Sequence, residues 1–309
     1  MPITVVGNVF VDIKGFPEDI YIPAGRNAGS VKTVHGGVGR NVAEDIANVE
    51  LRPRFVSMID NTGEGKAVKE KLENHKVDTR YLISAEDGMG IWLAVFDHTG
   101  DVVAAISKRP EMDALAKLIE ESGDEIFADA DSIVVEIDLR KDIIKRVFAY
   151  AEKYSVPVYA LVANMSIAVE RRDFITRTDC FICNVQEAGI LFVEDFSALE
   201  PEELCNVISE KIAAAGIKSM VVTMGEKGSV YVSSDGEKGV CPPQEVNVTD
   251  TTGAGDAFCA GVSIGLTYGK SLKDAAAIGT KLAASVITLP ENTCPRFRPS
   301  EFGITVDIK

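Results

Sequence analysis

The first third of the chain alternates short apolar runs with glycine-rich and polar connections. The run over 3–9 is apolar and β-branched, which predicts a buried strand that residues 11–13 continue. A shorter alternating strand is expected over 30–35. Two apolar runs, at 91–96 and 101–106, flank a polar turn and predict a β-hairpin. Because this hairpin is apolar on both faces, a ligand could cover one face and a partner subunit the other. An ordinary hairpin packed on the main core is the alternative.

Beyond residue 110 the pattern changes, because segments with helical spacing of apolar residues now alternate with strand-like runs. Helices are expected over 112–119, 143–148, 204–212 and 271–286, and strands over 132–137, 156–162, 179–183, 219–224, 229–233 and 239–248. Such alternation implies right-handed crossovers and a parallel sheet covered by helices on both faces. The sequence therefore predicts an α/β fold of three layers, α/β/α, with a mostly parallel central sheet.

Composition narrows the classes of partner. The chain has 309 residues, a net charge of −15 and a pI near 4.7, which argues against general binding to nucleic-acid polymers or anionic membranes. A local dipole can still bind a small anionic nucleotide. No apolar run approaches the roughly 18 residues of a membrane span, and the first residues do not resemble a signal peptide. Six scattered cysteines, with only Cys180 and Cys183 as a C-x-x-C pair, are expected to be buried thiols in a reducing cytoplasm.

The most informative stretch is DTTGAGDAFCAG, residues 250–261, where a loop becomes a helix. Gly253 and Gly255 allow backbone conformations and close approaches that a side chain would block. The first N–H groups of the helix then form an anion site, with the Asp256 carboxylate beside it. A carboxylate at such a place is well suited to take a proton from an attacking nucleophile. The alternative is that Asp256 only favours the helix dipole and the glycines make a tight turn.

Other polar residues follow predicted strands. Asp12 is expected at the end of a parallel strand, where ligand hydroxyl groups bind, with a solvated aspartate as the alternative. Asn184 and Glu187 follow another strand, where a helix-capping arrangement would be sufficient to explain them. A glycine run over 36–39 also precedes a helix start. A dinucleotide fingerprint would need a further glycine at Val42, so a Rossmann site is disfavoured.

The string DTTGAGDAFCAG resembles the signature of the PfkB (ribokinase-like) family of carbohydrate and nucleoside kinases. The resemblance implies one ribokinase-like kinase domain over 1–309, with a small β-sheet lid formed by about 10–34 and 88–107. It implies that Asp256 is the catalytic base. The anion hole for the transferred phosphoryl group would be formed by Gly253, Ala254 and Gly255.

Further segments match motifs of the same family. The paired glycine at 36–37 resembles the hinge beneath the lid, and the implied substrate contacts are Asp12, Gly36, Gly37 and Asn41. The N-x-x-E string resembles the motif that orders Mg²⁺ through Glu187 and water near the phosphates. The implied nucleotide-binding residues are Asn184, Thr223, Gly225, Lys227, Gly228 and Asn292. Groups near Asp250 and Thr252 are candidates for binding K⁺, as in many members of the family.

The resemblance implies ATP-dependent phosphorylation of a primary hydroxyl group on a nucleoside or sugar. The run GGVGRNVAE, at 36–44, is similar to the pseudouridine kinase branch, so pseudouridine is the first candidate and a ribokinase- or fructokinase-type sugar kinase the alternative. A sugar or nucleotide sensor and a dinucleotide oxidoreductase are alternatives from other classes. Residues 161–164 depart from the Asp-Pro-Asn-like string of many relatives, which puts a substrate contact from that segment in doubt. A homodimer through the lid is expected.

Overall fold

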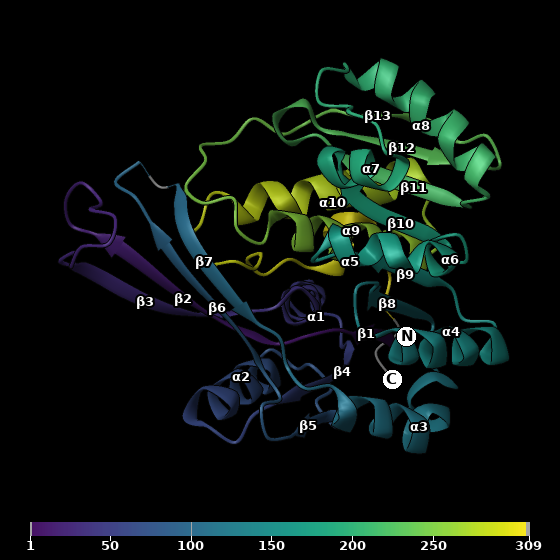
Figure 1. The fold of residues 1–309 in the computed structure, drawn as a ribbon. Helices are drawn as coiled ribbons and strands as arrows, with labels where there is room; N and C mark the ends of the chain where they lie inside the picture. The colour runs from purple at the N-terminus through teal and green to yellow at the C-terminus, as the bar shows by residue number, and fades with distance from the viewer. Residues whose placement is uncertain (1, 100, 307–309) are drawn as a thin grey trace.

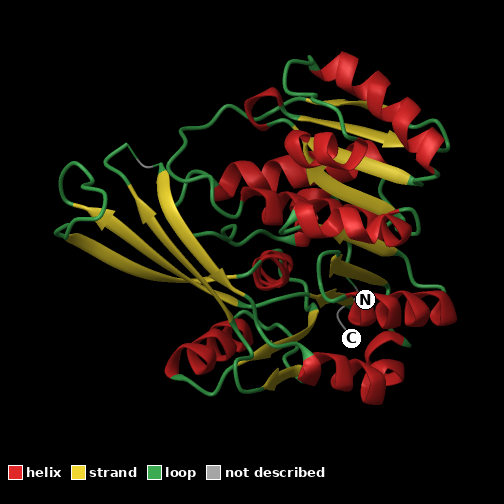
Figure 2. Ribbon diagram, viewed as in Figure 1, coloured by secondary structure: helices red, strands yellow, loops and turns green. Residues whose placement is uncertain are grey.

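The computed structural model describes residues 2–99 and 101–306 and contains two β-sheets (Figures 1 and 2). Both ends of the expected 1–309 domain, and Gly100 in the hairpin turn, lie outside the described residues. The larger sheet has nine strands. In spatial order they are β13 (Lys238–Cys241), β12 (Ser229–Ser233), β11 (Ser219–Thr223), β10 (Cys180–Asn184), β9 (Val158–Leu161), β8 (Ser132–Glu136), β1 (Ile3–Val6), β4 (Arg54–Ile59) and β5 (Leu82–Ser84).

Neighbouring strands of the larger sheet run parallel from β5 to β11, whereas β12 pairs antiparallel with both β11 and β13. One face is covered by α1 (Val38–Asn48), α2 (Gly63–Asn74), α9 (Ala254–Thr267) and α10 (Leu272–Val286). The other face is covered by α3 (Asp113–Phe127), α4 (Lys141–Tyr154), α5 (Met165–Ala168), α6 (Arg172–Ile175), α7 (Val185–Phe192) and α8 (Pro201–Ala215). The predicted three-layer α/β arrangement is confirmed. None of the described helices is both long and apolar enough to cross a membrane.

The two cores on either side of the larger sheet follow from the alternation of side chains along its strands. Val5 belongs to the core under α1 and α9, whereas its neighbour Val6 belongs to the core under α3 and α4. Cys180 and Cys183 likewise lie in opposite cores, as their spacing in a strand predicts. Three short 3₁₀ segments complete the described structure: η1 (Val169–Arg171), η2 (Gly225–Lys227) and η3 (Pro299–Phe302).

The smaller sheet, called here the small sheet, stands off to one side of the larger one (Figure 1). Its order is β3 (Gly29–Gly36), β2 (Phe10–Pro17), β6 (Gly90–Phe96) and β7 (Val102–Lys108). Strand β2 pairs antiparallel with β3 and parallel with β6, and β6 pairs antiparallel with β7. The predicted hairpin is therefore present, and it belongs with β2 and β3 to a sheet separate from the larger one.

The prediction that residues 3–13 form one strand was wrong. Strand β1 ends at Val6, and β2 begins at Phe10 in the other sheet. Between them, Gly7 packs so closely against α1 that an added Cβ would lie 2.7 Å from the Cα of Gly39. The N–H of Asn8 donates to the Glu136 carboxylate at 3.0 Å instead of to a neighbouring strand. Asp12 consequently lies within β2, not at the end of a parallel strand of the larger sheet.

The strand predicted over 239–248 was also wrong in its second half. Strand β13 ends at Cys241, and no regular structure follows until α9. Pro242 and Pro243 lack the backbone N–H that a strand must donate to its neighbour, so they end the pairing. The exposed segment after them delivers the chain to the start of α9, where the candidate site lies.

Candidate functional site

Helix α9 begins at a glycine that no other residue can replace without strain. Gly253 is its N-cap, with φ at +84°, and an added Cβ would lie 2.1 Å from the carbonyl oxygen of Asn292. Gly255 does not make the close approach that the sequence predicts for both glycines. It lies within the helix, and an added Cβ would meet no atom within 4 Å. The space in front of Gly255 is therefore open, so a ligand rather than the protein would be the close neighbour there.

Of the first four described amides of α9, two donate hydrogen bonds to the backbone and two do not. The Ala254 N–H donates to Thr251 at 3.3 Å, and the Ala257 N–H donates to Gly253 at 2.9 Å. Within the described part of the chain, the amides of Gly255 and Asp256 have no such partner. They are free donors at the positive end of a helix dipole, which is the arrangement that binds anions.

The Asp256 carboxylate lies in the first turn of α9, partly exposed, and meets a side chain from α1. The Nδ2 of Asn41 donates to its Oδ2 at 2.6 Å. Burial, together with the charges of Asp12 and Glu187, raises the pKa of Asp256 to about 7, against the lowering effects of the Asn41 hydrogen bond and the Arg40 charge. A carboxylate with that pKa can accept a proton near neutral pH and release it again.

The glycine pair at 36–37 brings the small sheet and α1 together. Gly36 ends β3, and an added Cβ would lie 2.5 Å from the Asp12 carboxylate. Gly37, the N-cap of α1, has φ at +98°, and an added Cβ would lie 2.5 Å from the carbonyl oxygen of Asn8. Burial raises the pKa of Asp12, whereas the charge of Lys14 lowers it. Asp12 and Asn41, far apart from Asp256 in sequence, are thereby placed near it.

Asn184 and Glu187 form the capping arrangement that the sequence offered as an alternative. The Glu187 N–H donates to Asn184 Oδ1, and the Asn184 N–H donates to Glu187 Oε2, both at 2.8 Å. The second carboxylate oxygen of Glu187 has no part in this pair of bonds. Burial raises the pKa of Glu187, the Asn184 hydrogen bond lowers it, and the charge of Asp138 raises it. A role in ordering Mg²⁺ remains a prediction.

The candidate nucleotide residues gather at the carboxyl ends of β10 and β11. Thr223 ends β11 and lies opposite Asn184 in the strand register. Gly225 and Lys227 belong to η2, which follows directly. Gly228, with φ at +89°, approaches the carbonyl oxygen of Cys241 so closely that an added Cβ would lie 2.2 Å from it. The Lys227 ammonium pairs with Glu200 at 2.9 Å on the surface.

Asn292 lies elsewhere and has other partners. Its Nδ2 donates to the carbonyl oxygen of His35 at 2.9 Å, and its Oδ1 accepts from Arg40 at 3.2 Å. Arg40 is fully buried and also donates to Glu44 at 2.6 Å and to the His35 carbonyl oxygen. The side chain of Asn292 thus holds the end of β3 against α1.

The next two residues continue this attachment, so the segment Asn292–Cys294 is called here the C-terminal strap. Thr293 Oγ1 donates to Glu44 at 3.0 Å, and the Cys294 N–H donates to Asp45 at 2.6 Å. Burial would raise the pKa of Glu44, but the charges of Arg40 and Lys71 lower it to about 2. Sequence reasoning missed the strap. The signal was a row of polar residues at helical spacing on α1: Arg40, Asn41, Glu44, Asp45 and Asn48.

Asp250 and Thr252 form a turn before α9. The Thr252 N–H donates to Asp250 Oδ1 at 2.8 Å. Burial acts to raise the pKa of Asp250, but the Thr252 hydrogen bonds and the charge of Lys14 lower it below its usual value. Among the described residues, no three His, Cys, Asp or Glu side chains are grouped to hold a metal ion. K⁺ binding by Asp250 and Thr252 remains a prediction.

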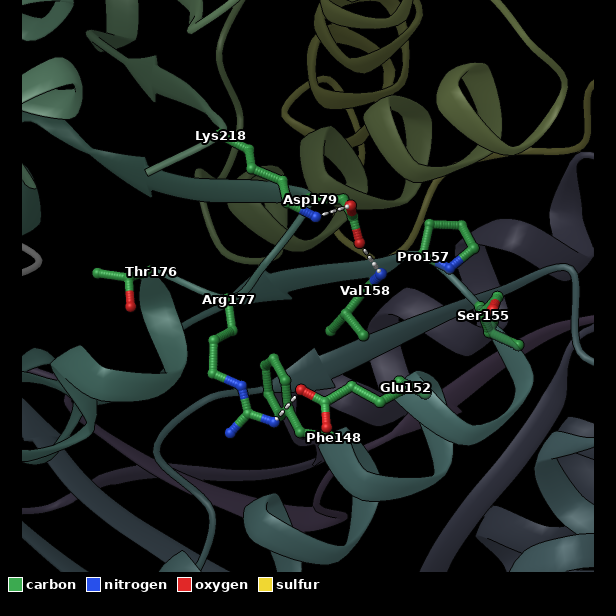
Figure 3. Close-up of a pocket in the computed structure, with 11 residues that line it drawn as sticks. Phe148, Glu152, Ser155, Pro157, Val158, Thr176, Arg177, Asp179 and Lys218 are labelled. Atoms are coloured by element: carbon green, nitrogen blue, oxygen red, sulfur yellow. Dashed lines mark hydrogen bonds and ion pairs between the residues drawn. The ribbon is translucent and has the colours of Figure 1, made fainter. Parts of the chain in front are cut away.

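A cavity of about 540 Å³ lies away from these residues, at the amino ends of β9 and β10 (Figure 3). Its charged side chains pair with one another. Arg177 meets Glu152 at 2.6 Å, and Lys218 meets Asp179 at 2.8 Å. None of the predicted site residues lines it, and ligands of parallel sheets bind at the carboxyl ends. The cavity is therefore no candidate for the chemistry.

Comparisons of the sequence and of the structure with known proteins agree on one protein family. Residues 2–294 match the family described as pfkB family carbohydrate kinase. A guanosine-inosine kinase from Exiguobacterium acetylicum is 36% identical over 94% of this chain and 95% of that protein. A pseudouridine kinase from Escherichia coli (strain K12) is 26% identical over 84% of this chain and 82% of that protein. A structure of Arabidopsis thaliana ribokinase complexed with ribose and ATP matches with a TM-score of 0.79 at 20% identity and covers 99% of both chains, which shows a ribokinase-like fold.

Proposed function

Because the chain belongs to the PfkB family of carbohydrate kinases, we propose that it transfers a phosphoryl group from ATP to a primary hydroxyl group of a nucleoside. The kinases of this family are phosphotransferases that act on a hydroxyl group. One observation carries the proposal. The Asp256 carboxylate, with its pKa raised to about 7, stands beside two free amides at the start of α9.

The residues suit an in-line transfer of this kind. Asp256 takes the proton from the attacking hydroxyl group, and Asn41 holds the carboxylate in place. The amides of Gly255 and Asp256 donate hydrogen bonds to the oxygens of the transferred group, and the open space before Gly255 admits it. Mg²⁺ usually binds one or two carboxylates together with substrate phosphates. Glu187 would order the ion through water, and the ion would neutralise phosphate charge.

Two relatives direct the choice of substrate. Pseudouridine remains a candidate, and the higher identity to the guanosine-inosine kinase adds guanosine and inosine. The test is ADP release with pseudouridine, inosine, guanosine, uridine, adenosine, ribose and fructose. We expect kcat/KM for one of the nucleosides to exceed that for ribose and fructose. Preference for ribose or fructose would indicate a sugar kinase, and ligand binding without ADP release would indicate a sensor.

The small sheet is proposed to act as a lid that closes over the site, with its hinge at the glycine pair 36–37. Its outer face exposes aliphatic side chains, with Val31 72%, Ile106 69% and Leu93 41% exposed. We therefore expect a second copy of the chain to cover this face and form a homodimer. Sedimentation should show a dimer that Ile106→Lys converts to a monomer. A wild-type monomer at micromolar concentration would exclude it.

A further expectation concerns the effect of K⁺ on activity. If Asp250 and Thr252 bind K⁺, kinase activity should be higher in potassium than in tetramethylammonium chloride at equal ionic strength. Equal activity in the two salts would remove that role.

All six cysteines are buried free thiols, which supports a reducing, cytoplasmic environment. Fractionation of cells that express a tagged chain would test the location.

A further inference from the structure

Two buried polar atoms of α1 have no hydrogen-bond partner. Asn41 is 4% exposed and Asp45 is fully buried. The Nδ2 of Asn41 donates to Asp256, but its Oδ1 accepts from no group in the described part of the chain. The Oδ1 of Asp45 accepts from the Cys294 N–H at 2.6 Å, but its Oδ2 has no partner among the same residues. Buried polar atoms are almost always satisfied, so this pair requires an explanation.

The two side chains lie on one face of α1. Asn41 and Asp45 are four residues apart, so they are neighbours on the helix surface, with Cβ atoms about 5–6 Å apart. This face packs against α9, where Asp256 meets Asn41, and against the C-terminal strap, where Cys294 meets Asp45. The two side chains form no direct hydrogen bond with each other. A single buried water molecule can bridge two polar groups at such a separation.

The surroundings of Asp45 decide which of the two atoms is the donor. Burial, together with the charges of Asp256 and Glu44, raises the pKa of Asp45 well above its usual value, against the lowering effect of the hydrogen bonds from Cys294. Burial also raises the pKa of the Cys259 thiol, which lies near Asp45 on α9, so that group carries no charge. A neutral carboxyl group has one O–H donor. Because Oδ1 already accepts a hydrogen bond, the proton belongs on Oδ2, the atom without a partner.

The orientation of the Asn41 amide affects the proposed base. With Nδ2 toward Asp256, the amide stabilises the ionised carboxylate. With Oδ1 toward Asp256, it would instead accept a hydrogen bond from the protonated acid. Because the pKa of Asp256 is about 7, both forms of the acid are populated at neutral pH. A donor directed at Oδ1 holds the amide in the first orientation, in which Asp256 is ready to accept a proton.

We propose that Asp45 is a positioning residue for the base. As a neutral acid, it donates through one buried water molecule to Asn41 Oδ1 and so keeps Nδ2 directed at Asp256. Because Asp45 is fully buried, it acts through Asn41 and not on the substrate. This inference rests on the proposed kinase activity with Asp256 as the base, and it adds a residue from the next turn of α1 to the support of that base.

Two variants of Asp45 separate a neutral donor from a charge. Leucine has a similar size and no donor, so Asp45→Leu should free the amide and raise the pKa of Asp256 by about one unit. The rising limb of kcat against pH should move with it, so kcat at pH 7 should fall about fivefold and recover at alkaline pH. Asparagine keeps a donor at the same place, so Asp45→Asn should keep the wild-type limb. A limb that moves to lower pH in Asp45→Asn would reveal the loss of a negative charge and would overturn the inference.

Thr293→Val is the matched control for a loosened strap. It removes the hydrogen bond from Thr293 Oγ1 to Glu44 and leaves Asp45 unchanged. This variant should unfold at a lower urea concentration and keep the wild-type limb. A second check is coupling between sites. In an Asn41→Leu background, Asp45→Leu should move the limb no further, because Asp45 acts only through Asn41. A further shift would contradict that route.

Infrared difference spectroscopy tests the inference without turnover. At pH 7, the spectrum of the wild type minus that of Asp45→Asn should contain the C=O stretch of a protonated carboxyl group. A carboxylate signal in its place would overturn the inference, even if Asp45→Leu does not fold. The wild type minus Asp256→Asn reports the titration of Asp256, with a midpoint near pH 7, and the same difference in the Asp45→Leu background should have a higher midpoint.

The combined results distinguish this inference from the kinase proposal. The expected spectra without ADP release from any substrate would support the positioning of Asp256 by Asp45 and refute the kinase activity. ADP release with an unchanged limb in a folded Asp45→Leu variant would refute the positioning role and leave the kinase activity intact.

Discussion

Replacing Asn41 by leucine tests the electrostatics of the proposed base. Among the described residues, Asn41 gives the only side-chain hydrogen bond to Asp256, at 2.6 Å. A hydrogen bond to a charged group contributes about 1.5–3 kcal/mol, and one pKa unit corresponds to about 1.4 kcal/mol. Without this bond, the pKa of Asp256 should rise by about one to two units above its value of about 7.

The direction of the pH effect follows from the form of Asp256 that is active. The base works as the carboxylate, so kcat of the wild type should rise with pH through about 7 and then level. In Asn41→Leu the rising limb should move to about pH 8–9. At pH 7 the ionised fraction then falls from about one half to between about one tenth and one hundredth, so kcat should fall by about 5- to 50-fold. Above about pH 9.5 most of that loss should be recovered.

The assay is ADP release at saturating nucleoside and ATP across this range of pH. Saturation separates the ionisation of Asp256 from any loss of substrate affinity in the variant. Asn48→Leu is the matched control, since Asn48 lies two turns further along α1 and donates to the carbonyl oxygen of Cys294 at 2.7 Å. Its pH profile should keep the wild-type limb. An equal loss in Asn41→Leu at every pH would refute this account of Asp256.

Four other substitutions separate chemistry from stability. Asp256→Asn should lower kcat by about 10²- to 10⁴-fold while calorimetry shows unchanged ATP affinity; substantial residual kcat would remove Asp256 as the base. Gly253→Ala should lower the free energy of unfolding by about 1–3 kcal/mol in urea, because its backbone is left-handed and its Cβ would meet a carbonyl oxygen. Gly255→Ala should unfold like wild type yet lose at least tenfold in kcat/KM, and retained activity would contradict the proposed phosphoryl position. Arg40→Met should lower the free energy of unfolding by about 3 kcal/mol at pH 7. This difference should shrink below about pH 4.5, because the low pKa of Glu44 stabilises the fold only while its carboxylate is ionised. A difference that does not depend on pH would contradict this account.

The parts of the site that the sequence predicts are those built by local rules. Asn184 and Glu187 have the spacing of a capping box, and that spacing alone fixes both hydrogen bonds. The glycine before α9 and the acid in its first turn likewise follow from a few adjacent residues. Pro242 and Pro243 carried a local signal too, because a strand cannot continue through them, and the prediction over 239–248 overlooked it.

What the sequence cannot give is the choice of distant partners. Glu136 binds the N–H of Asn8 and, at 2.6 Å, that of Gly39, and these bonds accompany the break between β1 and β2. Nothing in the residues around Glu136 indicates which amides it will meet. Asn292 is similar, because its side chain binds Arg40 and the His35 carbonyl oxygen, and nothing in the residues around it indicates these partners. The packing of α1 against β8 and against the C-terminal strap decides these pairs.

The C-terminal strap also constrains when the enzyme can mature. Asn292 meets Arg40 across 252 positions, so a ribosome must translate nearly the whole message before the two can bind. Until then the ionised groups of α1 stay hydrated, and the nascent helix cannot settle against α9. A chain that stops short of Asn292 would carry Asp12, Asn41 and Asp256, yet lack the contact that fastens them together.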